Sequence, residues 1–296
     1  MFLTVWFSPR GGVAASGCDL DTLVDMHLLL PPSEGKSAPA DGPAFDMDRL
    51  SFPELNESRE TVLSALIEVS RRDDAAKILK VRAKGSQEII AQRDMLNAPC
   101  APAREVYTGV LYEAAKLRHN DDVLIFSGLF GVTSGEDPIP SYRLSMNVSL
   151  PSIGPLKTFW RKALAGWSPD TGFAEELETP HQGSVNKAIG DMTARQESSI
   201  SGSTRNVDVT VDLRSELYRV TKPALSHDNG EWYDVRIANS HNKTVSHMAK
   251  HYRGLLTRAL LDSPTQSVVE VARTLGAVTV EHESGIRHLT LVPFGL

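Results

Sequence analysis

The chain has 296 residues, of which 41% are hydrophobic and 23% charged, and its formal net charge of −6 gives no overall attraction to nucleic acid or to an anionic membrane. This length allows one large domain or two small ones with a sizeable core. No stretch approaches the roughly 18 apolar residues of a membrane helix, and Cys18 and Cys100 are too few for a disulfide framework, so we expect a cytoplasmic protein without membrane contact.

The N-terminal segment, residues 1–25, is set apart from the rest. The run MFLTVWF is apolar, but Pro9 and Gly11 interrupt it and no positive charge precedes it, which argues against a signal peptide. We expect Met26 to be the natural start, residues 1–25 to be a non-native or disordered extension, and the folded domain to span 26–296.

The first predicted strand is HLLL, residues 27–30, and a polar loop follows it. Within that loop, Gly35-Lys36-Ser37 resembles the end of a phosphate-binding P-loop, but that motif requires a glycine where Leu30 stands. The P-loop is therefore excluded. What remains is Lys36 at the end of a first strand, where open α/β sheets often place ligands.

Helical patterns dominate the next part of the chain. Apolar residues recur at helical spacing over 58–71, and further helices are predicted over 78–96 and 110–117. Lys80 and Lys84 fall on the polar face of the second of these helices. The two lysines either contact a phosphate group or are simply exposed to solvent, and both interpretations remain open.

A second buried strand, residues 121–126, leads into a loop that forms one wall of the expected site. Ser127 and Gly128 follow the strand directly, and glycine lets a backbone approach a ligand closely. Two prolines downstream then favour an extended turn that presents Tyr142 and Arg143 side by side. This arrangement predicts a wall of an anion-binding cleft; the alternative is a strand, a loop and a turn with an exposed arginine.

The second half of the chain opens with a helix from about Leu156, on which Lys157 faces outward. Residues 168–206 are rich in Ser, Thr, Gly, Gln and Glu and have almost no apolar periodicity, which predicts a flexible insertion without a chemical role. The remaining predicted elements are strands at 207–213 and 233–241, helices at 245–261 and 268–275, and a closing hairpin around Ser284-Gly285.

The sequence supports neither a metal site nor a nucleophilic hydrolase. His247 and His251 are four residues apart on one predicted helix, as in zinc helices, but Lys250 and Arg253 beside them disfavour a divalent cation. No nucleophile elbow is present, and neither cysteine lies near a glycine-rich turn. We therefore expect no metal and no cofactor.

Candidate acids, bases and anion-binding groups occur at the ends of the predicted elements. The catalytic candidates are Tyr107, Asp212 and Glu216, although an ordinary surface or strand-end role competes for each. Arginine and lysine match phosphate and carboxylate groups, so convergence of the basic candidates would create an anion site. Those basic residues are Lys36, Arg143, Lys157, Arg214, Lys250 and Arg253.

Taken together, several motifs resemble the YaaA family, known as peroxide stress proteins. They are HLLLPPSEGK, APAREVYTGVLY, FSGLFGV followed by DPIPSYRLSM, FW, VDLRSELY and RGLLTR, and the resemblance runs from Met26 to the C-terminus apart from 168–206. It implies a mixed α/β (α+β) fold in one large domain, with mixed sheets wrapped by helices, a helix-hairpin-helix-like element near residues 80–93 and a basic cleft. It also places family positions on Lys36, Tyr107, Tyr142, Arg143, Lys250 and Arg253.

The resemblance further implies a cytoplasmic protein that limits intracellular free iron during peroxide stress and so protects DNA and protein. The segment LKVRAKGSQEI lacks a clear helix-hairpin-helix glycine spacing, which weakens the DNA assignment. Two classes therefore remain: a monomer that binds double-stranded DNA non-specifically through the basic cleft, and an enzyme acting there on a small anionic, nucleobase- or phosphate-bearing substrate. A groove ~20 Å wide would favour DNA, and a closed pocket of roughly 300–1,000 Å³ the small substrate.

Overall fold

The structure is a computed structural model that describes residues 24–82, 86–169, 172–173, 207–221, 230–241 and 246–295. The predicted N-terminal extension lies outside these ranges, apart from the residues that begin strand β1 (Val24–Leu30). Most of the predicted insertion lies outside them as well. Its first residues are described: β8 (Trp167–Ser168) pairs antiparallel with β9 (Gly172–Phe173).

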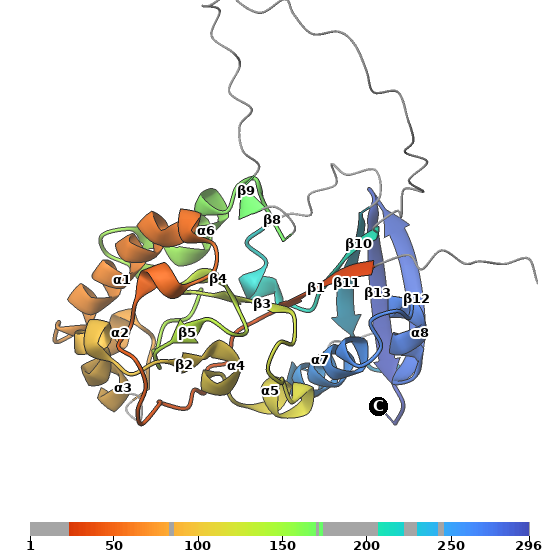
Figure 1. Ribbon diagram of the computed structural model, residues 1–296, viewed down its shortest axis with the longest axis horizontal. Coiled ribbons are helices and arrows are strands. Elements are labelled where there is room, and N and C mark those ends of the chain that lie inside the picture. The colour runs from red at the N-terminus through yellow and green to blue at the C-terminus, as the bar shows by residue number, and fades with distance from the viewer. Residues whose placement is uncertain are drawn as a thin grey trace, which may run out of the picture.

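A seven-stranded mixed sheet forms the centre of the fold (Figure 1). Its strand order is β12-β13-β11-β10-β1-β3-β4, with the five middle strands parallel and the two outermost strands antiparallel to their neighbours. Parallel strands are covered on both faces and are therefore apolar throughout, as the buried Leu28, Leu29 and Leu30 are. The other strands are β3 (Val123–Ser127), β4 (Gly131–Ser134), β10 (Val207–Asp212), β11 (Glu231–Ile237), β12 (Gly276–Glu283) and β13 (Ile286–Pro293).

The strand order reverses direction next to β1. The chain passes from β1 to β3 on one side, and then from β10 to β11 and β13 on the other side. In open α/β sheets, such a reversal leaves a crevice at the carboxyl ends of the two strands, because their following loops diverge. The loops that begin at Pro31, after β1, and at Leu213, after β10, therefore flank the same crevice.

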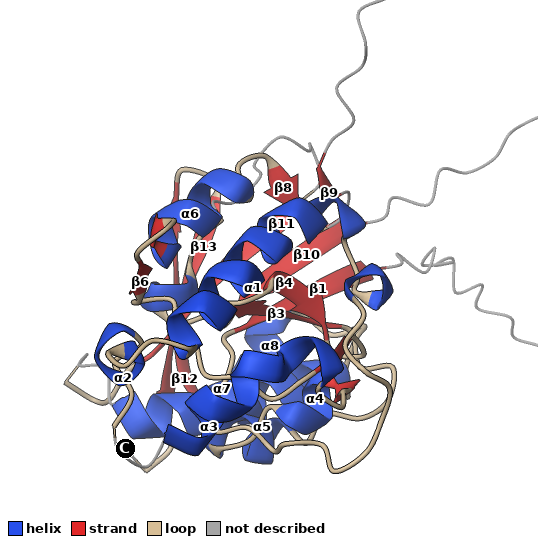
Figure 2. Ribbon diagram, turned by 90° about the vertical axis from the view of Figure 1, so that its left-hand side faces the viewer, coloured by secondary structure: helices blue, strands red, loops and turns tan. Residues whose placement is uncertain are grey.

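Helices cover the sheet at both of its ends. Figure 1 shows α1, α2, α3 and α6 gathered near β3 and β4, and α7 and α8 beside β11 to β13. Figure 2 shows α1 in front of the strands of the sheet. The helices are α1 (Asn56–Ser70), α2 (Ala75–Ile78), α3 (Ser86–Ala91), α4 (Ala103–Val106), α5 (Val110–Ala115), α6 (Leu156–Ala163), α7 (Ser246–Leu261) and α8 (Val268–Arg273). The 3₁₀ turns are Met47–Arg49, Pro53–Leu55, Gln92–Asn97 and Glu216–Tyr218, and the further strand pairs are β2 (Ala101–Pro102) with β5 (Pro138–Ile139) and β6 (Ser149–Leu150) with β7 (Gly154–Pro155).

Helices α5 and α7 approach each other closely at Gly254. A Cβ at this position would overlap the backbone carbonyl of Leu111 and would lie 2.8 Å from the Cβ of Ala114. Only glycine fits this spacing without a shift of one helix, because both neighbours belong to the rigid body of α5. The two helices are therefore held at a separation that depends on one residue.

The predicted mixed α/β class is confirmed, and so are most of its elements. The helix predicted at 245–261 is α7, and the hairpin turn has positive φ at Ser284 (51°) and Gly285 (82°), as a tight two-residue turn requires. The single helix predicted over 78–96 is wrong: α2 ends at Ile78, Lys80 has a φ of 56°, and residues 92–97 form a 3₁₀ turn. A left-handed residue ends an α-helix, and periodicity does not reveal it.

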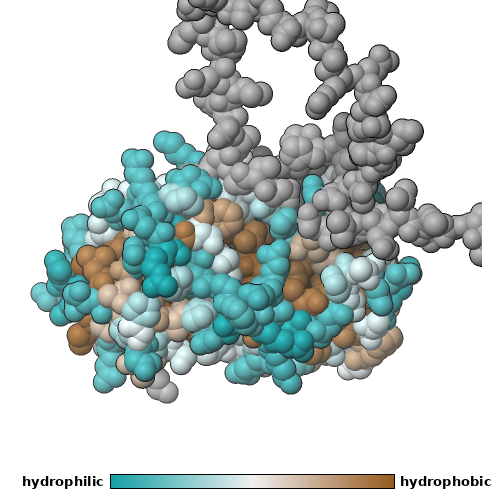
Figure 3. Space-filling view, viewed as in Figure 1, coloured by the Kyte–Doolittle hydropathy of each residue, from teal (hydrophilic) through white to brown (hydrophobic). Residues whose placement is uncertain are grey.

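The face shown in Figure 3 is mostly hydrophilic, with apolar residues visible in patches. Among the described residues, no helix combines the length and apolar character that crossing a bilayer requires. Residues 83–85 lie outside the described ranges, so the helix-hairpin-helix-like element stays a prediction.

Candidate functional site

The main pocket of the candidate site lies at the crevice between β1 and β10. It has a volume of about 480 Å³ and is lined by the loop after β1, the loop after β10, the start of α5 and the first turns of α7. Because parallel strands present their carboxyl ends at one edge, segments separated by nearly 200 residues meet here.

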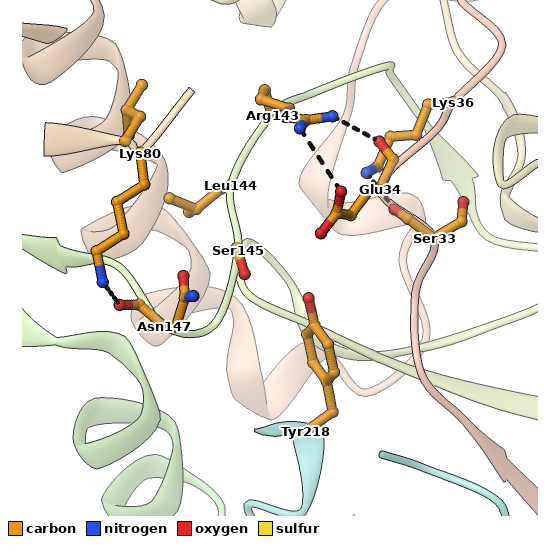
Figure 4. A pocket seen from close by; sticks show the side chains of 10 residues that line it. Ser33, Glu34, Lys36, Lys80, Arg143, Leu144, Ser145, Asn147 and Tyr218 are labelled. Carbon is orange, nitrogen blue, oxygen red and sulfur yellow. Dashed lines mark hydrogen bonds and ion pairs between the residues drawn. The ribbon is translucent and has the colours of Figure 1, made fainter. Parts of the chain in front are cut away.

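A smaller pocket of about 90 Å³, here called the lysine pocket, adjoins the main pocket. The two have Ser33, Glu34, Ser145, Asn147 and Tyr218 in common, and we refer to them together as the switch-point cleft. Figure 4 shows the side chains around the lysine pocket. Among the described residues, the acidic side chain lining the switch-point cleft is Glu34, and the basic ones are Lys36, Lys80, Arg143, Lys250 and Arg253.

Lys36 is half-buried in the lysine pocket. Its backbone forms a β-bridge with Tyr107, and its Nζ donates a hydrogen bond to the Ser33 carbonyl at 2.7 Å. The same Nζ lies 4.3 Å from the ring centroid of Tyr142 and 5.3 Å from that of Tyr107. Burial, followed by the positive charge of Arg143, lowers the pKa of the Lys36 amine to about 7. A large share of this amine is therefore uncharged at neutral pH.

Two buried tyrosines form the floor beneath Lys36. The hydroxyls of Tyr107 and Tyr142 are 2.7 Å apart and share a hydrogen bond. Burial raises the pKa of both phenols above their ordinary value, so both stay protonated and neutral. Neutral aromatic rings can hold the Lys36 amine through cation–π contacts, without a carboxylate from the tyrosines.

Arg143 forms the outer edge of the lysine pocket. Its Nη1 donates to the Glu34 carbonyl at 3.1 Å, and its guanidinium lies 3.8 Å from the Glu34 carboxylate and 3.9 Å from that of Glu88. Its backbone N–H donates to Gln92 Oε1 at 2.9 Å. The two ion pairs are long and partly solvated, so an incoming anion can compete for this guanidinium.

Lys250 and Arg253 form the opposite wall from one helix, α7. The Nε of Arg253 is buried and has no hydrogen-bond partner among the described residues. Burial and the neighbouring Arg219 lower the pKa of Arg253. An arginine N–H left unsatisfied in a buried position is costly, and a bound anion would relieve that cost.

A third pocket, of about 610 Å³, lies between α7 and strands β11, β12 and β13 and is here called the hairpin pocket. It has Ser215, Lys250 and Arg253 in common with the main pocket. The charges of its described residues are balanced: Arg219, Arg236, Lys250 and Arg253 face the carboxylates of Glu216, Asp234, Glu281 and Glu283. It is therefore a weaker anion site than the switch-point cleft.

Several of the sequence-predicted site residues serve the fold beneath or beside the cleft. Arg214 is fully buried, forms a two-pronged ion pair with Asp212 and lies 4.1 Å from the ring centroid of Phe126. The buried Ser127 accepts a hydrogen bond from the Phe130 N–H at 3.0 Å. These groups line none of the three pockets, so they position the loops that do.

Gly128 allows a close approach, although by the chain itself. A Cβ on Gly128 would lie 3.0 Å from the Leu144 carbonyl oxygen, and the Gly128 carbonyl accepts from the Trp160 indole at 2.9 Å. The glycine therefore lets residues 144–146 pack directly on the end of β3, and this packing fixes the Tyr142-Arg143 turn.

The remaining predicted residues lie at the periphery or outside the described ranges. Lys157 donates to the Glu216 carbonyl at 3.0 Å, and the Glu216 carboxylate faces the hairpin pocket. Lys80 lines the lysine pocket and donates to the Asn147 carbonyl at 2.6 Å. Lys84 and the side chain of His247 lie outside the described residues. Within them, no group of three or more His, Cys, Asp or Glu is suited to a metal ion.

Sequence reasoning missed the polar residues that connect the two pockets. Ser33 donates to the Gly35 carbonyl and accepts from the Thr108 N–H at 3.0 Å, which ties the loop after β1 to the turn before α5. Ser145 and Asn147 follow Arg143 on the opposite loop. The available signal was position: each of these residues follows a predicted strand or the Tyr-Arg pair by a few residues.

Comparison with known proteins gives one consistent family. The family model described as "Peroxide stress protein YaaA" matches residues 26–276. A UPF0246 protein of Streptomyces coelicolor is 33% identical over 268 residues, covering 85% of this chain and 90% of the relative. A UPF0246 protein of Corynebacterium efficiens is 33% identical over 282 residues, covering 90% of this chain and all of the relative. An uncharacterised protein of Campylobacter jejuni is 22% identical over 242 residues.

Proposed function

Because this chain belongs to the YaaA family of peroxide stress proteins, we propose that it acts in the cytoplasm during peroxide stress, limiting free iron and protecting DNA and protein. We further propose that it does so by binding phosphate groups in the switch-point cleft, with duplex DNA as the first candidate ligand. The observation that carries this proposal is the basic lining of the cleft: among its described residues, Lys80, Arg143, Lys250, Arg253 and the partly charged Lys36 face the single carboxylate of Glu34. Phosphate contacts of this kind are independent of base sequence.

The decisive test is a salt titration of duplex DNA binding with wild type, Arg143→Ala and Lys250→Ala. Binding through phosphates releases counterions, so log affinity should fall linearly with log salt, by about 0.9 per phosphate contacted. Each substitution should reduce that slope by about one phosphate. Arg72→Ala is the matched control, because Arg72 is exposed, pairs with Asp74 and lines none of the three pockets. An unchanged slope in both cleft variants would contradict DNA binding at this site.

A second candidate function is catalysis on a small phosphate-bearing substrate in the same cleft. The main pocket supports this candidate, because its volume of about 480 Å³ falls within the roughly 300–1,000 Å³ of small-molecule sites. Thermal unfolding with inorganic phosphate and with nucleoside mono-, di- and triphosphates separates the two. A ligand at 100 times its Kd stabilises by about 2.7 kcal/mol, an effect that Arg253→Ala should abolish and Arg72→Ala should leave intact.

The cellular proposal is tested with a strain that lacks this protein. Wild-type protein should restore survival after a peroxide pulse and lower the chelatable iron pool. Arg143→Ala should restore neither fully if phosphate binding in the cleft is required. Full rescue by a variant that no longer binds DNA or phosphates would separate iron control from the switch-point cleft.

A further inference from the structure

We propose that Lys36 is a nucleophile that forms an imine with an aldehyde carrying a phosphate group. This inference rests on the second candidate function above and names its substrate class. It follows from the placement of the Lys36 amine over the rings of Tyr107 and Tyr142, in a pocket that Arg143 and Lys80 also line (Figure 4).

The surroundings of Lys36 are those of a reactive amine. Its Nζ is positioned by the Ser33 carbonyl at 2.7 Å, and the tyrosine rings beneath it are neutral. An amine with a pKa of about 7 is half uncharged at pH 7, about a thousandfold more than an amine of ordinary pKa 10.5. Lowering of a lysine pKa by burial and a neighbouring cation is the usual way to activate a Schiff-base lysine.

The cations around Lys36 define the rest of the substrate. Arg143 and Lys80 line the lysine pocket itself, and Arg253 lines the adjoining main pocket with its Nε unpaired. The lysine pocket, at about 90 Å³, accommodates a group as small as an aldehyde, while the main pocket accommodates the body of the molecule. A compound spanning both would present its carbonyl to Lys36 and its phosphate to arginine.

The step balances without an added redox partner. The Lys36 nitrogen attacks the aldehyde carbon, a C–N bond forms, and the carbonyl oxygen leaves as water with the two protons of the amine. The product is an imine that water can reverse or a hydride donor can reduce. Two sources offer the same chemistry: a free sugar phosphate, and the ring-opened sugar of an abasic site in DNA, which carries phosphates on both sides.

Borohydride trapping on the full-length protein tests the proposal. The probes are glyceraldehyde 3-phosphate, glyceraldehyde without phosphate, and a duplex containing one abasic site, and peptide mass mapping locates each adduct. Trapping with a phosphate-bearing probe should map to Lys36 and should rise as pH passes through about 7. Lys36→Arg should lower it by at least about tenfold. The matched control Lys77→Arg should not, because Lys77 is exposed and lines none of the three pockets.

The trapping results distinguish the two sources of the aldehyde and can also overturn the proposal. Trapping of the sugar phosphate alone supports a metabolite source, and trapping of the abasic duplex alone supports a DNA source. Adducts spread over surface lysines, or equal trapping of glyceraldehyde, would overturn the proposal. Peptide mapping of wild type decides the matter even if Lys36→Arg does not fold. Wild-type protein that binds DNA or phosphates but is never trapped refutes the nucleophile and leaves the proposed function standing.

Discussion

At the scale of single residues, Arg59 is a buried charge whose contacts are all structural. It is fully buried, and its guanidinium donates to the carbonyls of Ser51, Phe52, Phe130 and Val132 at 2.7–3.1 Å. Five N–H donors in a rigid fork satisfy these acceptors, and no other side chain reproduces that geometry.

We predict that Arg59→Lys will destabilise the protein by about 3 kcal/mol or more, because several buried carbonyls lose their donor. Urea unfolding measures the loss. Arg72→Lys serves as the control, since Arg72 is exposed and should change stability by less than about 0.5 kcal/mol. Similar losses for both variants would show that the Arg59 contacts contribute little.

The lowered pKa of Lys36 makes a second prediction, on pH and stability. Between the folded pKa of about 7 and the unfolded value of 10.5, the unfolded chain binds more protons at this site, so stability should rise with pH in that window. Below about pH 7 the amine is protonated in both states, and the burial penalty is fully present. Lys36→Met removes the penalty.

The unfolding free energy of wild type relative to Lys36→Met should therefore increase steadily from pH 7 to pH 10. Denaturant titrations of both proteins across that range measure it, and groups common to both cancel. A difference that stays flat would mean that Lys36 has an ordinary pKa, which would also remove the chemical basis for imine formation.

The sequence indicated which residues to examine but not which would reach the cleft. Lys36, Arg143, Lys250 and Arg253 line the switch-point cleft, whereas Arg214 is enclosed with Asp212. Spacing places a residue at the end of an element, but an arginine two residues from a carboxylate can turn inward to pair with it. Only the tertiary packing decides between those orientations.

At the scale of elements, the contact of α5 with α7 sets the width of the main pocket, because Leu111 and Tyr112 line one wall and Lys250 and Arg253 the other. Gly254→Ala should favour the isolated helix by about 1 kcal/mol. The added methyl group clashes with α5, and this cost exceeds the gain in helix propensity. We therefore predict that Gly254→Ala lowers the free energy of unfolding by about 1–3 kcal/mol. Phosphate or DNA binding should weaken as well.

Gly166→Ala is the matched control for that prediction. Gly166 has a φ of 83° and nothing within 4 Å of an added Cβ, so it carries backbone strain of about 1 kcal/mol without crowding, and it lines none of the three pockets. Thermal unfolding and ligand titration of both variants separate the effects. Unchanged binding in a folded Gly254→Ala protein would show that helix spacing does not control the pocket.

Apolar periodicity predicted the helices and strands that bury one apolar face, and it failed to predict the others. The apolar stripe of α7 and the alternation around Ser284-Gly285 predicted their elements closely. The left-handed conformation of Lys80 could not be predicted from the sequence, because lysine rarely adopts positive φ unless tertiary contacts impose it. Two-residue strands such as β2 and β5 form only by pairing with a distant segment, so no local sequence pattern predicts them.

At the scale of the whole molecule, the predicted insertion supplies a test of what the fold requires. The composition of residues 174–206 predicts that they belong to a flexible insertion, and in the sequence they lie between β9 and β10. Replacing 174–206 with a flexible Gly/Ser linker should therefore preserve cooperative unfolding and cleft binding. A large loss of either, measured by circular dichroism and ligand titration, would give the segment a role.

The sheet order also decides when the protein can become functional. β1 is complete at Leu30, yet its neighbour β10 begins at Val207, and the arginine opposite Lys36 arrives only with Arg253. A chain emerging from the ribosome must keep one side of an apolar central strand unpaired through most of its synthesis, a high contact order that slows folding. The cleft needs Arg253, so translation products that end before α7 should lack binding and should engage chaperones.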